Sequence, residues 1–355
     1  MSTARLSTAS PPIRSRDHIT RVASGLLCLL AVVVGTGIGA LAIPPSALAS
    51  ILADTVGVDI FAHDATQATV LWAIRLPRVL LGLLIGAALS VAGVLMQALF
   101  RNPLASPQLI GVSGGAALAA ASVIALLPAA ATAGTLGAFT LPLGAFTGAV
   151  AVSLVTLRIG SRGGTPDVVT LLLAGVAINA LTGAGLGLLV FIADDAQLRS
   201  ITFWSLGSLS AATWPIVGAL ALATSGLVAF AWHHRTAFDL LLLGSEDARH
   251  LGVPVEKLQR RMVVVTALAV GAAVAFTGII GFVGLVVPHL CRLWAGPAHH
   301  RLIPLSTLVG GALLVFADTT ARTAVAPAEL PLGVLTTLLG APFFLLLLAR
   351  ARRFA

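Results

Sequence analysis

The sequence predicts an all-α polytopic membrane protein with about ten transmembrane helices. The 355-residue chain is 58% hydrophobic and only 10% charged, whereas soluble domains carry roughly 25% charged residues. Its mean hydropathy is +1.03. The apolar residues form long continuous runs, unlike the short alternating segments of transmembrane β-barrels. Composition and run length together therefore indicate a bundle of membrane-spanning helices.

The first predicted span covers residues 24–43 and leaves residues 1–23 as an N-terminal tail. A secretory signal peptide is the alternative, because arginines precede this run and the A-L-A sequence at 47–49 resembles a cleavage site. A signal core has about 7–15 apolar residues, whereas this run has about 20, which is enough to cross a bilayer. We therefore favour a span.

Nine further apolar runs are separated by charged residues, glycine or proline. They predict spans at residues 79–100, 109–127, 136–157, 168–192, 216–232, 263–280, 281–292, 304–317 and 333–348. The eighth should be short or broken, because Gly281, Gly284 and Pro288 interrupt it. The membrane domain then covers residues 24–350, and residues 351–355 form a C-terminal tail.

Glycines recur at positions where helices could approach one another closely. The chain has 36 Gly, with Gly82 and Gly86 one helical turn apart and further clusters at residues 183–185 and 310–311. Small residues allow membrane helices to pack backbone against backbone. We therefore expect a tightly packed bundle.

The basic residues predict the orientation of the chain. Ten spans place both termini on one side, and 17 of the 21 Lys and Arg fall on that side. The other side carries Arg75, Arg78, Arg199 and Arg322. Because Lys and Arg concentrate in cytoplasmic loops, we expect both termini in the cytoplasm. The net charge of +8 is dispersed over these loops and does not indicate binding of nucleic acid.

A polar stretch at residues 237–257 lies between the sixth and seventh spans. It contains a run of four leucines, and Gly244 and Gly252 are placed to end short helices. We expect two short helices that lie on a membrane face and offer a surface to a soluble partner. An ordinary connecting loop is the alternative.

Short motifs follow one another in a characteristic order from about residue 70 to about residue 345. They include R-L-P-R at 75–78, R-N-P-L-A at 101–105, G-V-S-G-G-A at 111–116, L-L-A-G at 172–175, G-F-V-G-L-V-V-P-H at 281–289 and E-L-P at 329–331. Each motif is weak alone. Their order and spacing resemble the permease subunits of ATP-driven importers for iron–siderophores, haem and cobalamin, the FecCD or BtuC type.

This resemblance implies the permease fold of a type II ABC importer in the bacterial inner membrane. It implies a homodimer with a translocation path along the dimer axis, a cytoplasmic ATPase dimer that uses ATP and Mg, and a periplasmic substrate-binding protein. The only lysine, Lys257, lies outside any glycine-rich phosphate loop. We therefore expect a transport subunit that has no catalytic residue and binds no cofactor itself.

The resemblance also assigns two groups of residues on the cytoplasmic side. The polar stretch becomes the coupling surface for the ATPase, with Leu243, Gly244, Glu246, Ala248, Arg249, Leu251 and Gly252. A cytoplasmic gate would contain Asn102 and Leu104, together with Val168 and Val169. Better-known relatives carry small hydroxyl residues at the last two positions, so this part of the gate departs from the family pattern.

Three arginines on the outer side are candidate docking points for the binding protein. The resemblance places Arg75, Arg78 and Arg322 opposite carboxylates of that partner, and guanidinium groups bind carboxylates with two parallel hydrogen bonds. Local pairing is the alternative, for example of Arg322 with Asp318 one helical turn earlier.

Cargo is the least determined property. The run at residues 317–331 most resembles the haem-importing branch, with ferric siderophore and cobalamin as alternatives. We expect no metal site, because a ligand such as His289 or Cys291 would hold cargo that must leave the pore. An ion-coupled carrier would need ionisable groups at mid-membrane, where only Asp318 comes near. No HExxH motif indicates a membrane enzyme, and the G-V-S-G-G run at 111–115, although it fits GxSxG, is part of the glycine-rich motif quoted above.

Overall fold

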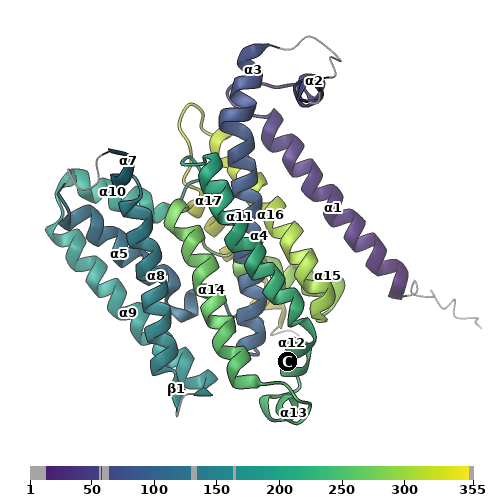
Figure 1. Cartoon of the computed structure of the whole chain (residues 1–355), viewed down its shortest axis with the longest axis vertical. Helices are drawn as coiled ribbons and strands as arrows, with labels where there is room; N and C mark the ends of the chain where they lie inside the picture. The colour runs from purple at the N-terminus through teal and green to yellow at the C-terminus, as the bar shows by residue number, and fades with distance from the viewer. Residues whose placement is uncertain (1–12, 56, 58–63, 129–133, 163–164, 352–355) are drawn as a thin grey trace, which may run out of the picture.

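The computed structural model describes residues 13–55, 57, 64–128, 134–162 and 165–351, which form a bundle of helices (Figure 1). The first half contains α1 (Ile13–Gly37), α2 (Pro45–Asp54), α3 (Ala65–Val70), the π-helical turn η1 (Leu71–Arg75), α4 (Leu76–Leu99), the 3-10 turn η2 (Pro107–Ile110), α5 (Val112–Leu126), α7 (Gly134–Gly137) and α8 (Thr140–Ile159). A two-stranded antiparallel hairpin follows, made of β1 (Ser161–Arg162) and β2 (Thr165–Pro166).

The second half is also helical. It contains α9 (Val168–Ile192), α10 (Asp195–Leu206), α11 (Trp214–His233), α12 (Arg235–Leu241), α13 (Ser245–His250), α14 (Val255–Thr277), α15 (Val283–Ala295), α16 (His299–Thr323) and α17 (Leu332–Ala351). Figure 1 places α12, α13 and the hairpin at one end, which we call the α13 end. The opposite end carries α2, α3 and α7, and we call it the α3 end.

The predicted all-α polytopic fold is confirmed. In the described residues seven helices are long and apolar enough to cross a membrane, and three shorter apolar helices accompany them. These helices correspond to the ten predicted spans. The first begins earlier than expected, since α1 starts at Ile13. The remaining tail residues, 1–12 and 352–355, lie outside the described residues, as do 58–63.

The second span is longer than the sequence suggested. We expected the second span to begin at residue 79, but α3, η1 and α4 form one apolar helix over Ala65–Leu99. The helix passes through Pro77 with a π-helical turn directly before it. Its 35 residues are about 52 Å long at 1.5 Å per residue, and the hydrocarbon core is about 30 Å thick. The N-terminal part of this helix therefore extends beyond the bilayer.

The centre of the bundle is built on α4, which is buried along most of its length. A Cβ added to Gly86 would lie 2.1 Å from the carbonyl oxygen of Gly310, so α4 and α16 touch backbone to backbone. Gly93 approaches Gly284 of α15 in the same way. The expected close packing is confirmed at these helices. It is wrong for Gly183, because nothing lies within 4 Å of a Cβ built there.

The eighth span is short, as predicted, but α15 continues through Gly284 and Pro288 and the break lies before it, between Gly278 and Phe282. Gly278 follows α14 with φ +69°, and a Cβ there would lie 1.9 Å from the carbonyl oxygen of Trp204. Phe282 precedes α15 in the left-handed region, with φ 64°. The chain therefore turns before α15, which has only 13 residues.

Candidate functional site

The two predicted short helices are present at the α13 end. Gly244 separates α12 from α13 with φ +135°, and Gly252 follows α13 with φ +88°, conformations that favour glycine. Leu243 and Leu251 are 63% and 59% exposed, so the end of the molecule presents apolar side chains between charged ones. Such a surface suits a protein partner.

The seven candidate coupling residues do not all face outward. Glu246 and Arg249 are exposed, and the Nε of Arg249 donates to Oε1 of Glu256 over 3.1 Å. Ala248, by contrast, is fully buried and packs in the main core. Its side chain supports α13 and cannot itself touch a partner.

A polar contact fastens α12 to the beginning of α16. The Oδ1 of Asp239 accepts from the backbone N–H of His299 over 2.9 Å and lies 2.6 Å from the ring Nδ1. Burial acts to raise the pKa of Asp239, but the hydrogen bonds from His299 outweigh it and hold that pKa below its usual range. The short helices are therefore tied to a helix that crosses the whole bundle.

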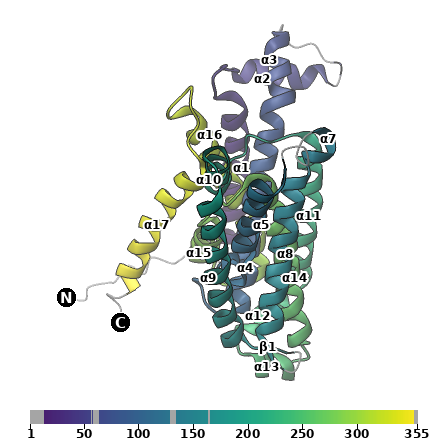
Figure 2. The same ribbon diagram turned by 90° about the vertical axis from the view of Figure 1, so that its left-hand side faces the viewer.

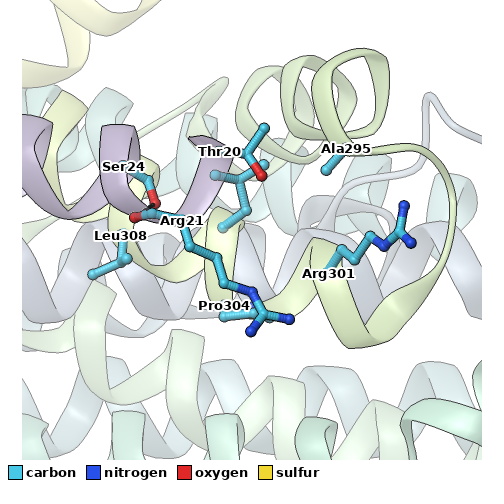
Figure 3. A pocket seen from close by; sticks show the side chains of 8 residues that line it. Thr20, Arg21, Ser24, Ala295, Arg301, Pro304 and Leu308 are labelled. Carbon is cyan, nitrogen blue, oxygen red and sulfur yellow. Dashed lines mark hydrogen bonds between the residues drawn. The ribbon is translucent and has the colours of Figure 1, made fainter. Parts of the chain in front are cut away.

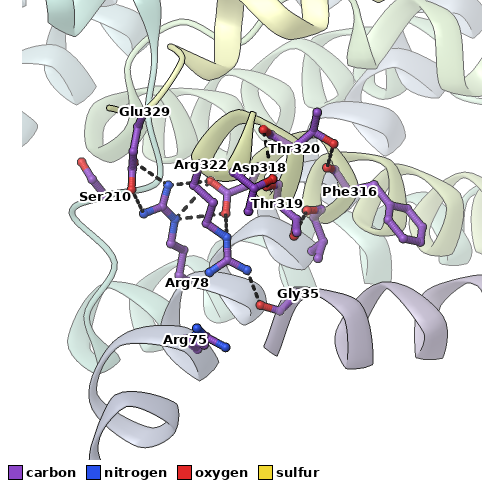
Figure 4. Close-up of polar contacts among 12 residues, drawn as sticks. Gly35, Arg75, Arg78, Ser210, Phe316, Asp318, Thr319, Thr320, Arg322 and Glu329 are labelled. Carbon is purple, nitrogen blue, oxygen red and sulfur yellow. Dashed lines mark hydrogen bonds and ion pairs between the residues drawn. The ribbon is translucent and has the colours of Figure 1, made fainter. Parts of the chain in front are cut away.

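The far end of α16 takes part in a second polar site at the α3 end (Figure 4). We call it the polar cluster, and it consists of Arg75, Arg78, Asp318, Arg322 and Glu329. Arg78 is central. Its Nε and Nη2 donate to Asp318 over 3.0 Å and 2.9 Å, and its Nη1 and Nη2 donate to Glu329 over 3.0 Å and 2.9 Å. One guanidinium group thus binds two carboxylates.

The other two arginines of the cluster are turned toward α1. Nη1 of Arg75 donates to the carbonyl oxygens of Thr36 and Gly37 over 2.6 Å and 2.9 Å. Arg322 donates to the carbonyl oxygen of Gly35. The last carbonyl groups of a helix lack intrahelical partners, and cations are favourable there. The two arginines therefore cap the C-terminus of α1.

Helix lengths place the polar cluster near one boundary of the membrane. Asp318 lies 19 residues after His299, the first residue of α16, which corresponds to about 29 Å. Arg78 lies 21 residues before Leu99, the last residue of α4, or about 32 Å. Both distances match the thickness of the hydrocarbon core.

The structure shows local pairing for every arginine that we expected to dock a partner. Arg75 is buried, and the side chains of Arg78 and Arg322 are only 11% and 10% exposed. The alternative pair is also present, with Arg322 Nε 3.9 Å from Asp318. Sequence reasoning missed Glu329 as a partner of Arg78, although its motif E-L-P had been noted.

The candidate gate residues lie in two places. Asn102 forms a tight turn, in which its Oδ1 accepts from the N–H of Leu104 over 2.9 Å. Leu104 lines a small pocket with residues of α15 and α17, including His289 and Phe343. Val168 and Val169 begin α9, directly after its N-cap residue Asp167.

Two cavities differ in size and character. A groove of about 520 Å³ lies between α15, α16 and α17, and its walls are mainly apolar, including Phe282, Phe316 and Phe343. A second pocket lies between α1, α15 and α16 and is lined by Arg21 and Arg301 (Figure 3). Its volume is about 20 Å³, which is room for little more than a water molecule.

Comparisons with known proteins agree on one family. The family model described as the FecCD transport family matches residues 27–350. The chain is 47% identical to the hemin transport system permease protein of Yersinia pestis over 287 residues, which are 79% of this chain and 83% of that protein. It is 40% identical to the cobalamin import system permease protein of Halobacterium salinarum over 289 residues, 81% of this chain and 75% of that protein.

A solved structure supports the same assignment. It is described as an inward-facing conformation of a metal-chelate type ABC transporter and has a TM-score of 0.75 and 30% identity to this chain. The match covers 94% of this chain and 99% of that one. With its apolar helices, its helical pair at the α13 end and the family match over nearly its whole length, the chain belongs to the FecCD transport family of ABC importer permeases.

Proposed function

We propose that this permease imports haem into the cytoplasm as the membrane-spanning subunit of an ATP-driven complex. The family match over residues 27–350 carries the proposal. Three surfaces of the molecule support it. They are the exposed leucines at the α13 end, the polar cluster at the α3 end, and the thinly packed side of the bundle, by which we mean the exposed faces of α9 and α17.

The α13 end is the docking surface for a cytoplasmic ATPase. Leu243 and Leu251 project from α12–α13 with charged residues around them, which gives a surface with an apolar centre and a polar rim. The tie between Asp239 and His299 connects this surface to α16. A movement of the ATPase can therefore be passed to a helix that spans the bundle.

The α3 end is the docking surface for a periplasmic substrate-binding protein. Three arginines and two carboxylates leave the polar cluster with one net positive charge, which favours an acidic partner. Arg78 is the arginine of this cluster whose carboxylate partner Glu329 is exposed.

A second copy of the chain covers the thinly packed side of the bundle. Only 11% of the α9 span is buried within one copy. Figure 2 shows α17 leaning away from the other helices, and the N-terminal half of α17 lines the apolar groove of about 520 Å³. A homodimer would bury these surfaces and enclose a path between the copies.

Haem is the cargo that the similarities favour. The relative at 47% identity is described as a hemin transport permease, and the run at residues 317–331 resembles the haem branch. The large apolar groove with aromatic side chains suits a flat amphiphilic molecule. Ferric siderophore and cobalamin remain the alternatives, because a relative at 40% identity is described as a cobalamin import permease.

An ion-coupled carrier is less consistent with these contacts. Asp318, the acidic residue nearest to the membrane core, is bound by Arg78 through three hydrogen-bond contacts. A carboxylate held in this way is poorly suited to carry a proton in each cycle.

Transport into proteoliposomes tests the proposal. The permease is reconstituted with its partner ATPase and substrate-binding protein, and haem, a ferric siderophore and cobalamin are supplied in turn. We expect haem to accumulate only with ATP on the ATPase side, and the permease alone to hydrolyse no ATP. Accumulation of another cargo would reassign the substrate, and uptake without the ATPase would overturn the proposal.

A further inference from the structure

The two carboxylates that bind Arg78 differ in how easily each could leave. The side chain of Asp318 is 6% exposed and lies among other buried residues near the C-terminal end of α16. Glu329 is 43% exposed and comes from the connection between α16 and α17. Removing a buried partner leaves an uncompensated charge inside the protein, whereas an exposed partner is replaced by solvent at little loss.

Glu329 also blocks access to Arg78. With Glu329 in place, Arg78 is 11% exposed, and its outward nitrogen atoms Nη1 and Nη2 are the ones that donate to Glu329. Its inner edge, formed by Nε and Nη2, faces Asp318. A partner can therefore reach this guanidinium group only after Glu329 has moved.

We propose that Glu329 is a stand-in for a partner's carboxylate, which replaces it on the outward edge of Arg78 when an acidic protein docks at the α3 end. The inference rests on the proposed docking of a substrate-binding protein. The exchange is balanced, since two charge-assisted hydrogen bonds are broken and two equivalent ones are formed. Withdrawal of Glu329 raises the net charge of the polar cluster from +1 to +2, which attracts the incoming carboxylate.

The exchange would release the connection between the last two helices. Residues 324–329 are exposed, and few backbone contacts hold them, such as the hydrogen bond from the N–H of Leu330 to the carbonyl oxygen of Ala321 over 2.9 Å. The connection leads into α17, where the N–H of Leu332 donates to the carbonyl oxygen of Gly207 at the end of α10 over 3.0 Å. Docking on Arg78 thereby acts on α17 and α10.

Binding measurements test the exchange. The variants Glu329→Ala and Glu329→Gln are reconstituted in nanodiscs, and the affinity of the partner substrate-binding protein is measured by surface plasmon resonance. Loss of an internal competitor as weak as an exposed ion pair, roughly 0.2–1 kcal/mol, should tighten binding by up to about fivefold for Glu329→Ala. Equal or weaker binding would overturn the proposal, because Glu329 would then hold Arg78 in place for the partner and would not compete with it.

A matched control separates exchange from general attraction. Asp195 is an exposed carboxylate at the start of α10, at the same end of the molecule, and in the described contacts it does not touch Arg78. Asp195→Asn removes the same charge and should leave the affinity unchanged within about 1.5-fold, since a single exposed charge contributes little. An equal gain in affinity for Asp195→Asn would overturn the exchange, because the net charge of this end of the molecule would then explain both variants.

A spin label on the connection gives a second measure. Ala326→Cys is labelled in a variant that also carries Cys28→Ser, because Cys291 is buried. We expect the label to become more mobile when the binding protein docks, and to be mobile without any partner in Glu329→Ala. Docking at normal affinity without a change in mobility would overturn the exchange alone. A wild-type permease that binds no substrate-binding protein would overturn the docking surface as well.

Discussion

Asp318 should stabilise the fold far more than Glu329, although both bind the same arginine. The Asp318 carboxylate accepts from Nε and Nη2 of Arg78 and lies 3.9 Å from Nε of Arg322, and its side chain is 6% exposed. The variant Asp318→Asn keeps the shape but removes the charge, and both guanidinium groups lose a buried counter-ion. Breaking a buried pair in this way costs about 3–5 kcal/mol.

The magnitude can be converted into an unfolding temperature. Unfolding entropy is roughly 2.1 cal/mol/K per residue, or about 0.7 kcal/mol/K for a chain of 355 residues. Asp318→Asn should therefore lower Tm by about 4–7 °C. Glu329→Gln, which removes an exposed pair of about 0.2–1 kcal/mol, should lower it by about 1 °C or less.

The assay uses a buried thiol as the reporter. Cys291 is fully buried, so a maleimide dye reacts with it when the protein unfolds on heating in detergent, in a background that carries Cys28→Ser. Glu256→Gln is the matched control, because it removes one carboxylate from an exposed pair with Arg249 at the opposite end. A Tm shift for Asp318→Asn as small as that of the two Gln variants would refute the reasoning from burial.

Three further predictions concern the coupling surface, the helix contacts and the response to pH. Leu243→Asp combined with Leu251→Asp should remove the ATPase from the affinity-purified complex without changing Tm, because both side chains are exposed; retention of the ATPase would exclude them as contacts. Gly86→Ala should lower Tm by several degrees, because the new methyl group would overlap a carbonyl oxygen of α16, whereas Gly183→Ala meets nothing within 4 Å and should be neutral. Equal Tm shifts would contradict this packing. Hydrogen bonds from the neighbouring guanidinium group hold the pKa of Glu329 below its usual 4.5. A carboxylate whose pKa is lower in the folded state stabilises the fold at pH values above its unfolded pKa, and this contribution is lost as pH falls through the folded pKa. The small Tm difference between wild type and Glu329→Gln should therefore be complete at pH 7 and disappear in acid well below pH 4.5. A difference that persists there would contradict the ion pair.

The architecture was readable from the sequence because its signals are local. A membrane span is a run of about 20 apolar residues, and each such run can be recognised without knowing which other helices pack against it. The two short helices at the α13 end were also predictable. Gly244 and Gly252 adopt backbone angles that other residues avoid, whereas the break before α15 falls at Gly278, which the sequence had placed inside the seventh span.

The candidate sites were only partly readable, because a sequence gives the kind of side chain and not its direction. Ala248 was expected on the surface offered to the ATPase, yet it lies within α13 with its side chain in the core. The polar stretch around it predicted an accessible surface, and Leu243 and Leu251 do lie on one. Burial at a single position depends on how α13 lies against the rest of the bundle, which no local pattern contains.

The sequence by itself determined the membrane class, the ten helical spans and the presence of a few arginines on the side opposite most of the basic residues. Only the tertiary structure decided what those arginines do, since Arg78 meets carboxylates 240 and 251 positions away. Arg75 and Arg322 turn to the carbonyl groups that end α1. A charge near the membrane boundary takes the nearest available partner, because an unpaired ion there is costly. Which partner is nearest is fixed by the packing of α1, α4 and α16 against one another.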